Sequence, residues 1–341
     1  MEKKISIIIP CYNVERYIRR CLDSLLCQTI GLACLELICV NDASTDNTLS
    51  ILLEYEAAYP DNFIIINFEE NRKQGAARNA ALTYASGDYI GYVDSDDYVE
   101  PDMFETLYQA IVAHDCDFVE CHWNIVNDTA KRKEAGNIGV PGFVDLSVYE
   151  NRMDYIAISI GMTALWNKLF KKSFLVENDI FCPEGLRYED IFFCYLAYLY
   201  ANRYYRVDAA LYNYYQNEQG TVRTRHASYQ FDKMDVMLFF FDVCSERGLY
   251  QKYPAEVEWM FLEKFYVYML WEVFQEFPEQ SYYFYCKLKN MVVTLLPHYK
   301  ENPYQFLEAN ATDAFMLRLI EKDISADALE EIRCKLLQAF A

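Results

Sequence analysis

Two carboxylates separated by a single residue, Asp94 and Asp96, are the groups best suited to chemistry in this 341-residue sequence. They follow the apolar run 89–93, and alternate residues of an extended chain point to the same side. Two like charges held together are costly unless a cation neutralises them, and Mg²⁺ or Mn²⁺ bound this way completes its shell with substrate phosphates. The pair therefore predicts a divalent-cation site that handles a phosphorylated substrate. The alternative is an acidic turn in which Asp97 caps the next helix.

Three further side chains have the chemistry to bind a nucleotide. Asp42 follows the apolar run 35–40, and its carboxylate can accept a hydrogen bond from the imino group of a base. Tyr12 follows the run 5–9, and its ring either stacks on a base or packs against the protein. Arg78 lies among small residues that let a phosphate approach closely; in so acidic a protein, the alternative is a surface arginine paired with an acid.

Alternating strands and helices are expected to position these residues. Apolar runs typical of buried strands alternate with helical patterns near the start of the chain, the strands being 5–9, 35–40, 63–66, 89–93 and 116–121. Asn13 is expected to cap the first helix and Asp46 the second. This order predicts an α/β fold with a doubly wound, mostly parallel sheet, in which ligands bind at the carboxyl ends of the strands. Polar clusters follow the strands at 10–13, 41–46, 71–74 and 94–97.

The rest of the chain is less regular and then becomes helical. Glycines and a basic tripeptide mark loops within 127–160, an apolar helix is expected over 191–200, and 204–215 is tyrosine-rich and extended. From about residue 231 glycine nearly disappears and helical patterns continue to the end. We therefore expect a helical C-terminal region.

The net charge of −20 limits the partners of the protein. So acidic a chain is repelled by nucleic-acid phosphates and by anionic lipid surfaces, which argues against nucleic-acid binding. The twelve cysteines are scattered, which indicates reduced thiols and a cytoplasmic location. No stretch reaches the roughly 18 uninterrupted apolar residues of a membrane span. The protein is therefore expected to be soluble, with at most a peripheral position at the inner face of the membrane.

Six motifs, in the same order along the chain, resemble those of the family 2 glycosyltransferases, which have the GT-A fold. They are IIIPCYN (7–13), CVNDASTD (39–46), NRKQGAARNAAL (71–82), GDYIGYVDSDD (87–97), LWNKLFKK (165–172) and YEDIFF (188–193). About the last 110 residues resemble nothing that we can place. The resemblance implies a catalytic domain over 1–225, with a nucleotide-sugar-binding half (1–125) and an acceptor half (126–225), followed by a helical region (226–341).

The resemblance also implies roles at the matching positions. Donor contacts, usually to uracil for the base, are expected from Pro10, Tyr12, Asn13, Asp42, Arg78 and Asp94. Asp94 and Asp96 match the DXD motif, in which Asp96 is the more direct ligand of manganese or magnesium. Asn41 replaces the aspartate that usually precedes Asp42, and the base contact is retained in the prediction because an amide both donates and accepts.

An inverting mechanism is implied as well. Asp190 matches the base that deprotonates the acceptor hydroxyl, and Glu189 is the alternative. A helix beginning at this point would make Asp190 a helix cap and lower its pKa. The metal would stabilise the departing diphosphate as a Lewis acid. His226 or Arg223 is expected near the metal or the diphosphate.

The predicted function is transfer of a sugar from a nucleoside-diphosphate donor, UDP being the expected nucleotide, to a hydroxyl of a saccharide or lipid-linked saccharide in surface polysaccharide assembly. Trp166 is expected in the acceptor wall, with core packing as its alternative. A nucleotidyltransferase is a second hypothesis, although it needs a Gly-rich basic loop where 10–13 has none. A non-catalytic sugar-nucleotide-binding subunit is a third, against which the intact acidic motifs argue. The C-terminal helices either pack on the catalytic domain or form homodimer or peripheral membrane contacts.

Overall fold

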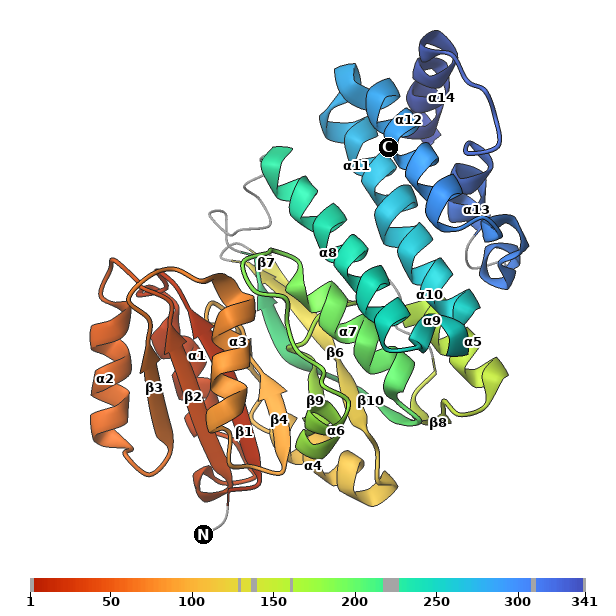
Figure 1. The fold of residues 1–341 in the computed structure, drawn as a ribbon. Helices are drawn as coiled ribbons and strands as arrows, with labels where there is room; N and C mark the ends of the chain where they lie inside the picture. The colour runs from red at the N-terminus through yellow and green to blue at the C-terminus, as the bar shows by residue number, and fades with distance from the viewer. Residues whose placement is uncertain are drawn as a thin grey trace. The chain divides into compact units, whose positions relative to one another are not determined.

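The computed structural model describes residues 3–127, 130–135, 140–159, 162–216, 227–307 and 311–339. The chain divides into two compact units, Met1–His226 and Ala227–Ala341. The first contains a single mixed sheet with helices packed against it, and the described residues of the second are helices and their connections (Figure 1).

Four parallel strands form one half of the sheet, in the order β3-β2-β1-β4 (Figure 1). They are β1 (Ile5–Cys11), β2 (Leu35–Asn41), β3 (Phe63–Asn67) and β4 (Tyr89–Tyr92). Every residue of β1 and β2 is buried, because helices cover both faces of a parallel sheet. The helices of this half are α1 (Ile18–Leu26), α2 (Thr48–Ala58), α3 (Lys73–Tyr84) and α4 (Met103–His114). The predicted βα alternation is confirmed here.

The second half of the sheet is mixed in direction. β9 (Lys168–Lys171) lies antiparallel between β4 and β6 (Phe118–Asn127), whereas β10 (Arg203–Tyr215) runs parallel to β6. Three short strands pair antiparallel with their neighbours, namely β5 (Tyr98–Val99), β7 (Ala130–Ala135) and β8 (Gly142–Asp145). The helices of this half are α5 (Tyr149–Ser159), α6 (Lys172–Glu177) and α7 (Glu189–Tyr200). The predicted α/β class with flanking helices is confirmed, and β9 is the strand that joins the two halves.

A buried ion cluster ties the strands of the mixed half together. Glu120 on β6 accepts hydrogen bonds from Arg206 Nε and Nη2 at 3.0 and 2.8 Å and from the Tyr204 hydroxyl. Lys168 Nζ on β9 lies 3.3 Å from the other oxygen of the same carboxylate. Burial acts to raise the pKa of Glu120, but the charges of Lys168 and Arg206 outweigh it and lower the pKa. The carboxylate therefore stays ionised inside the protein.

The predicted helix cap at Asn13 is wrong. α1 begins at Ile18, and Asn13 adopts a left-handed backbone with φ of 53°. Its Oδ1 accepts a hydrogen bond of 2.8 Å from the Thr45 main-chain N–H, so the side chain links the loops after β1 and β2. Asp46 does act at the start of α2, because its Oδ1 accepts from the Thr48 N–H at 3.0 Å.

The second unit is helical, as the sequence predicts. Its main helices are α8 (Ala227–Glu246), α9 (Leu249–Lys252), α10 (Pro254–Phe261), α11 (Met269–Glu276), α12 (Ser281–Leu295), α13 (Ala311–Arg318) and α14 (Ala326–Ala339). A π-helical segment, η2 (Leu262–Tyr268), joins α10 to α11 and is mostly buried. None of the helices in the described ranges combines the length and the apolar character needed to cross a membrane.

Two lysines on β9 test how much the buried cluster contributes. Lys168 is completely buried, whereas the Lys171 side chain is 41% exposed and lies 3.2 Å from Asp115. We expect Lys168→Met to lower the free energy of unfolding by about 3 kcal/mol, because a buried carboxylate loses one of its two cations. Lys171→Met is the control and should cost less than about 1 kcal/mol. Urea unfolding followed by circular dichroism measures both, and equal losses would contradict the expectation.

Candidate functional site

The candidate site lies along the carboxyl ends of the parallel strands. The ends of β1, β2 and β3 are aligned, with Cys11 opposite Asn41 and Asn41 opposite Asn67. The Asp42 N–H continues this pairing with a 2.9 Å hydrogen bond to the Cys11 carbonyl oxygen. The loops that follow the strands therefore start at one level, as expected for a parallel sheet.

Two predicted base-binding residues are held differently at this edge. Tyr12 is 49% exposed, so part of its side chain is accessible to a ligand. Asp42 is buried, and its Oδ1 accepts a 2.7 Å hydrogen bond from the Arg72 N–H, which leaves Oδ2 without a protein donor among the described residues. Pro10 lies within β1 opposite Val40, and its side chain has no polar group to offer a ligand.

Asn41 stands where the family pattern has an aspartate, and its side chain links two neighbouring strands. Its Nδ2 donates a 2.7 Å hydrogen bond to Asn67 Oδ1 on the neighbouring strand. An ionised aspartate could not donate to that oxygen. The Asn41 side chain therefore joins the ends of β2 and β3.

Left-handed backbone conformations gather around this edge. Asn13 and Ala43 lie in the loops after β1 and β2, Lys73 is the first residue of α3, and Tyr188 directly precedes α7; their φ values are 53°, 56°, 66° and 63°. Such conformations cost free energy in non-glycine residues and persist where the surrounding contacts impose them. The loops of the candidate site are thus held in shapes that the chain would not adopt alone.

Asp97 is a structural member of the acidic turn. It is buried, its Oδ2 accepts a 2.6 Å hydrogen bond from the Tyr212 hydroxyl, and its Oδ1 accepts one of 2.7 Å from the Tyr215 N–H. The Tyr212 oxygen in turn accepts from the Asp94 N–H at 3.2 Å. The predicted alternative, in which Asp97 caps the next helix, is wrong because Asp97 binds β10 instead.

Asp96 is the acid of this turn that lacks a protein partner. Arg20 donates to its main-chain oxygen at 2.7 Å, and in the described parts of the chain no side chain donates a hydrogen bond to its carboxylate. Burial and the charge of Asp94 raise the pKa of Asp96 to about 6. A half-buried carboxylate beside a second acid is the environment that a divalent cation stabilises.

The residues present fit a cation that is shared with a substrate phosphate. Among the described residues, no three His, Cys, Asp or Glu side chains are placed to hold a metal ion by themselves. Mg²⁺ and Mn²⁺ sites of nucleotide-handling proteins need only one or two carboxylates when phosphates complete the shell. Asp94 and Asp96 provide that set. His226 and Arg223, which the sequence also suggested, lie outside the described residues.

Arg78 is the central cation of the site. Its side chain is 4% exposed, Nη1 donates to Glu189, and Nη2 donates to Asp94 Oδ1 at 3.0 Å. The alternative of a surface arginine is wrong, because the residue is paired with acids but lies inside the protein. Both terminal nitrogens are engaged, whereas the buried Nε has no hydrogen-bond partner in the described structure. Arg78 therefore joins the acidic turn to the first turn of α7.

The two candidate bases at the start of α7 differ in their surroundings. Glu189 is buried, and its carboxylate forms an ion pair with the Arg78 guanidinium. Asp190 is half-buried, and its Oδ1 accepts a 3.0 Å hydrogen bond from the Ile191 N–H. Burial and the neighbouring charge of Glu189 raise the pKa of Asp190 to about 7, although Arg78 and the helix N–H act to lower it. The helix end therefore acts to lower this pKa, as expected, but burial and the charge of Glu189 outweigh it.

The loop that leads into α7 is packed against α3, a contact that the sequence did not reveal. Asn79 Nδ2 donates to the Cys182 carbonyl oxygen at 2.8 Å, and Asn79 Oδ1 accepts from the Cys182 N–H at 2.9 Å. A Cβ atom at Gly75 would collide with the Pro183 carbonyl oxygen. The helix that carries Arg78 thus fixes the loop that presents Asp190. A glycine within an alanine-rich helix was the available signal.

Trp166 lies one ring away from the acidic turn. Its ring stacks on Tyr212 with centroids 4.3 Å apart and an interplanar angle of 19°. Tyr212 is the residue whose hydroxyl bonds Asp97, so the aromatic stack and the acidic turn share a side chain. The sequence singled out Trp166 but not Tyr212 or Tyr214, which also flanks the ring at 5.9 Å.

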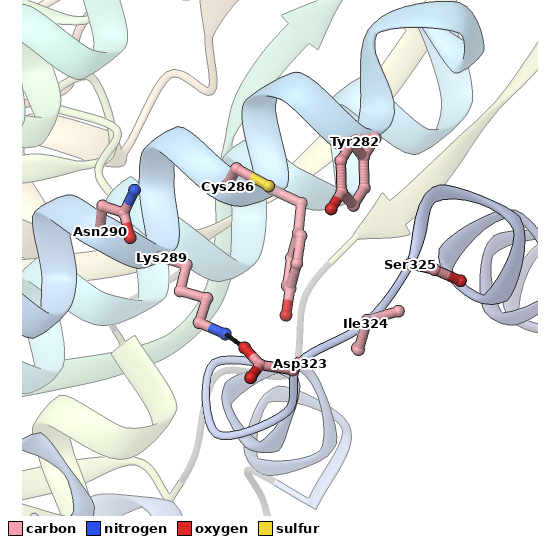
Figure 2. Close-up of a pocket in the computed structure, with 8 residues that line it drawn as sticks. Tyr282, Cys286, Lys289, Asn290, Asp323, Ile324 and Ser325 are labelled. Atoms are coloured by element: carbon pink, nitrogen blue, oxygen red, sulfur yellow. Dashed lines mark hydrogen bonds and ion pairs between the residues drawn. The ribbon is translucent and has the colours of Figure 1, made fainter.

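A separate pocket of about 400 Å³ belongs to the helical unit (Figure 2). Its polar groups are largely used within the protein. The Tyr285 hydroxyl donates to the Leu319 and Lys322 carbonyl oxygens at 2.8 and 2.7 Å, and Lys289 Nζ donates to the latter at 2.6 Å and pairs with Asp323 at 3.5 Å. Figure 2 shows Lys289 turned toward Asp323 across the pocket. The pocket contains none of the predicted site residues.

The fold and the edge described above define the class of protein. A sheet of this kind with acids at its carboxyl edge is the GT-A arrangement, which solved structures of similar fold support. The family model for Glycosyl transferase family 2 matches residues 6–177, about half of the chain. The chain belongs to this family.

Three curated relatives illustrate the similarity and its extent. Glycosyltransferase GlyA of Streptococcus pneumoniae is 35% identical over 184 residues, which cover 50% of this chain and 25% of that protein. Poly(ribitol-phosphate) beta-glucosyltransferase of Bacillus spizizenii is 36% identical, covering 59% and 30%. The uncharacterized glycosyltransferase YibD of Escherichia coli is 29% identical, covering 64% and 63%. Each relative extends well beyond the part that this chain matches.

Two solved structures resemble the fold. Staphylococcus aureus TarS 1–349 in complex with UDP-GlcNAc has a TM-score of 0.72 at 20% identity, covering 98% of this chain and 92% of that one. The mannosyltransferase PcManGT from Pyrobaculum calidifontis, in complex with GDP-Man and Mn²⁺, has a TM-score of 0.52 at 15% identity, covering 95% and 87%. At these identities the likeness extends to the fold alone.

The raised pKa of Asp96 predicts how the stability of the metal-free protein depends on pH. Because this pKa is raised on folding, the ionised carboxylate destabilises the fold fully above about pH 6, and the penalty shrinks as pH falls from there toward the ordinary value of 3.8. At pH 7.5 in EDTA we expect Asp96→Asn to raise the free energy of unfolding by about 1–3 kcal/mol. If Asp94 and Asp96 hold a cation together with a substrate phosphate, the same change should also abolish the rise in Tm that we expect UDP with Mn²⁺ to produce.

Asp88→Asn is the matched control, since Asp88 is exposed at the opposite end of β4. It should leave both quantities unchanged. Thermal unfolding with and without UDP and Mn²⁺ provides the measurement. A lower Tm of Asp96→Asn in EDTA would contradict the electrostatic account.

Proposed function

We propose that this protein transfers a sugar, with inversion, from a UDP-sugar to a hydroxyl group of a saccharide acceptor in bacterial surface polysaccharide assembly. The observation that carries the proposal is one connected group of charges. Arg78 bonds Asp94 of the acidic pair and Glu189, and Glu189 adjoins Asp190, whose pKa is raised to about 7. A carboxyl group with a pKa near neutrality is suited to act as a general base.

The nucleotide assignment rests on the strand-end residues and on the structural neighbours. Part of the Tyr12 side chain is accessible, and Asp42 is held by the Arg72 N–H so that Oδ2 is left for a base N–H. The TarS structure is described with UDP-GlcNAc and the mannosyltransferase with GDP-Man, so the fold accepts more than one base. We favour UDP because a single carboxylate oxygen suits the one imino N–H of uracil.

The cation would be held by Asp94 and Asp96, and Mn²⁺ or Mg²⁺ are the ions that match such oxygen ligands. When bound, it supplies Lewis-acid stabilisation of the departing diphosphate. Arg78 does not compete for this role, because its terminal nitrogens are engaged by Glu189 and Asp94.

Asp190 is the base in this proposal. Its carboxylate accepts the proton of the acceptor hydroxyl while the oxygen forms a bond to the anomeric carbon and the bond from that carbon to the diphosphate breaks. The single displacement inverts the configuration and needs no covalent nucleophile. Glu189 is unsuited to the same task because its pairing with Arg78 stabilises its charge and blocks its approach to a substrate.

The two alternative functions would require features that the described residues do not favour. A nucleotidyltransferase would draw its phosphate contacts from a glycine-rich loop after the first strand, and the segment 12–17 contains no glycine. A non-catalytic sugar-nucleotide-binding subunit would have no use for a carboxyl group with a pKa near neutrality. Both alternatives therefore have less support than transfer.

We place the reaction in the cytoplasm. All twelve cysteines are free, and most of them are buried thiols, which suits a reducing compartment. The helical unit presents exposed aromatic side chains, including Tyr283 at 63% and Phe306 at 74% exposure. These support contact with a second copy or with a membrane-bound acceptor through that unit.

Asp190→Asn tests the assignment of the base. We expect turnover of the UDP-sugar to fall by about 10²- to 10⁴-fold, while UDP with Mn²⁺ still raises Tm as in the wild type, because the change removes the proton acceptor alone. Glu177→Gln, at an exposed acid on α6, is the control and should keep full activity. Turnover is measured as UDP release from a panel of UDP-sugars. Full activity of Asp190→Asn would refute the assignment.

The pH profile provides an independent test. Because Asp190 must be ionised to accept a proton, and its pKa is about 7, kcat/KM should fall by about tenfold for each pH unit below this value. Saturating Mn²⁺ keeps the titration of Asp96 out of the profile. A profile that is flat between about pH 5.5 and 8 would contradict the proposed role.

A further inference from the structure

Three half-buried aromatic residues form a layer at the edge of the mixed half-sheet. Trp166 precedes β9, Trp123 lies on β6 and Tyr214 lies on β10. The rings of Trp166 and Tyr214 are nearly parallel, with an interplanar angle of 9°, and Trp123 meets Trp166 edge-on at 5.7 Å. Fully buried Tyr212 supports this layer by stacking on Trp166 at 4.3 Å.

The layer is anchored to the acidic turn by hydrogen bonds. Tyr212 donates to Asp97 Oδ2 at 2.6 Å and accepts from the Asp94 N–H at 3.2 Å. One aromatic ring therefore separates Trp166 from the turn that carries the cation-binding pair. A group resting on the layer would lie beside the site of the reaction.

Core packing accounts for Tyr212 but not for the whole layer. Trp123, Trp166 and Tyr214 keep part of their surface accessible, although large aromatic side chains gain most when fully buried. In the described residues, the indole N–H groups of Trp123 and Trp166 have no hydrogen-bond acceptor, and neither lies among the buried unpaired groups. Part of the surface of these three side chains is thus available for contact with a ligand.

We propose that Trp123, Trp166 and Tyr214 form a subsite for a pyranose ring of the acceptor. This inference rests on the proposed function and adds to it that the acceptor is a ring sugar rather than an open-chain alcohol. One face of a pyranose carries C–H groups that pack on the negative face of an aromatic ring, and its hydroxyls can accept from indole N–H groups.

Saturation-transfer NMR on the full chain with UDP and Mn²⁺ tests the inference. The probes are methyl β-D-glucopyranoside, which has a ring face, and ribitol, which has similar hydroxyls but no ring. We expect saturation of C–H protons on one face of the pyranoside and about a fivefold loss of that signal in Trp166→Leu, with partial recovery in Trp166→Phe. Ribitol should give little signal in any variant.

Trp271→Leu is the matched control, because Trp271 is a half-buried tryptophan of the helical unit. It should leave the pyranoside signal unchanged. The rise in Tm caused by UDP with Mn²⁺, measured on each variant, shows that the fold and the donor site are intact. Equal pyranoside signals in the wild type and Trp166→Leu, or a ribitol signal as strong as that of the pyranoside, would overturn the subsite. Failure of the wild type to bind UDP with Mn²⁺ or to release UDP from a UDP-sugar would instead overturn the proposed function.

Discussion

The arrangement of the candidate site depends on one buried guanidinium group shared between two carboxylates. Burial alone would lower the pKa of Arg78, but the charges of Glu189 and Asp94 outweigh it and raise the pKa well above its usual range. A charge out of water is tolerated only when it is paired at close range, so the position of Arg78 determines where both acids must lie. Helix α3, the turn after β4 and the first turn of α7 are thereby held in one geometry.

This sharing leaves the site short of positive charge. Arg78 neutralises Glu189 and part of Asp94, while among the described residues no side-chain cation forms an ion pair with Asp96 or Asp190. Burial is the main cause of their raised pKa values, about 6 and about 7, and the charges of Asp94 and Glu189 add to it. Under our proposal, a divalent cation neutralises Asp96. Asp190 is neutralised when it takes the proton of the acceptor hydroxyl. The same electrostatic imbalance would thus serve metal binding and catalysis.

The two halves of the sheet are coupled through a second buried acid. Asp97 bonds Tyr212 and the Tyr215 N–H, so the loop that carries the acidic pair is attached to β10 of the mixed half. The ion cluster of Glu120, Lys168 and Arg206 then holds β10 against β6 and β9. Aromatic stacking on Tyr212 continues the same connection to Trp166. The acidic turn and the aromatic layer are therefore positioned by one set of contacts.

The sequence alone determined the βα order, the parallel strands and the placing of Asp42, Asp94 and Asp96 at strand ends. These follow from apolar periodicity and from the rule that parallel strands end at one edge, both of which are local in the chain. It could not determine the antiparallel insertion of β9, because pairing between strands distant in sequence leaves no period in the residues themselves.

Only the tertiary structure decided what the charged residues do. Glu189 lies 111 residues from Arg78 and Asp94 lies 16 residues from it, and their pairing arises from packing between α3, the turn after β4 and α7. Asp97 binds β10 rather than a helix end, and the pKa of Asp190 is raised although helix N-termini lower acid pKa values. Residue type states which charge a side chain can carry, but its protonation and partners depend on burial and on neighbours that the fold brings together.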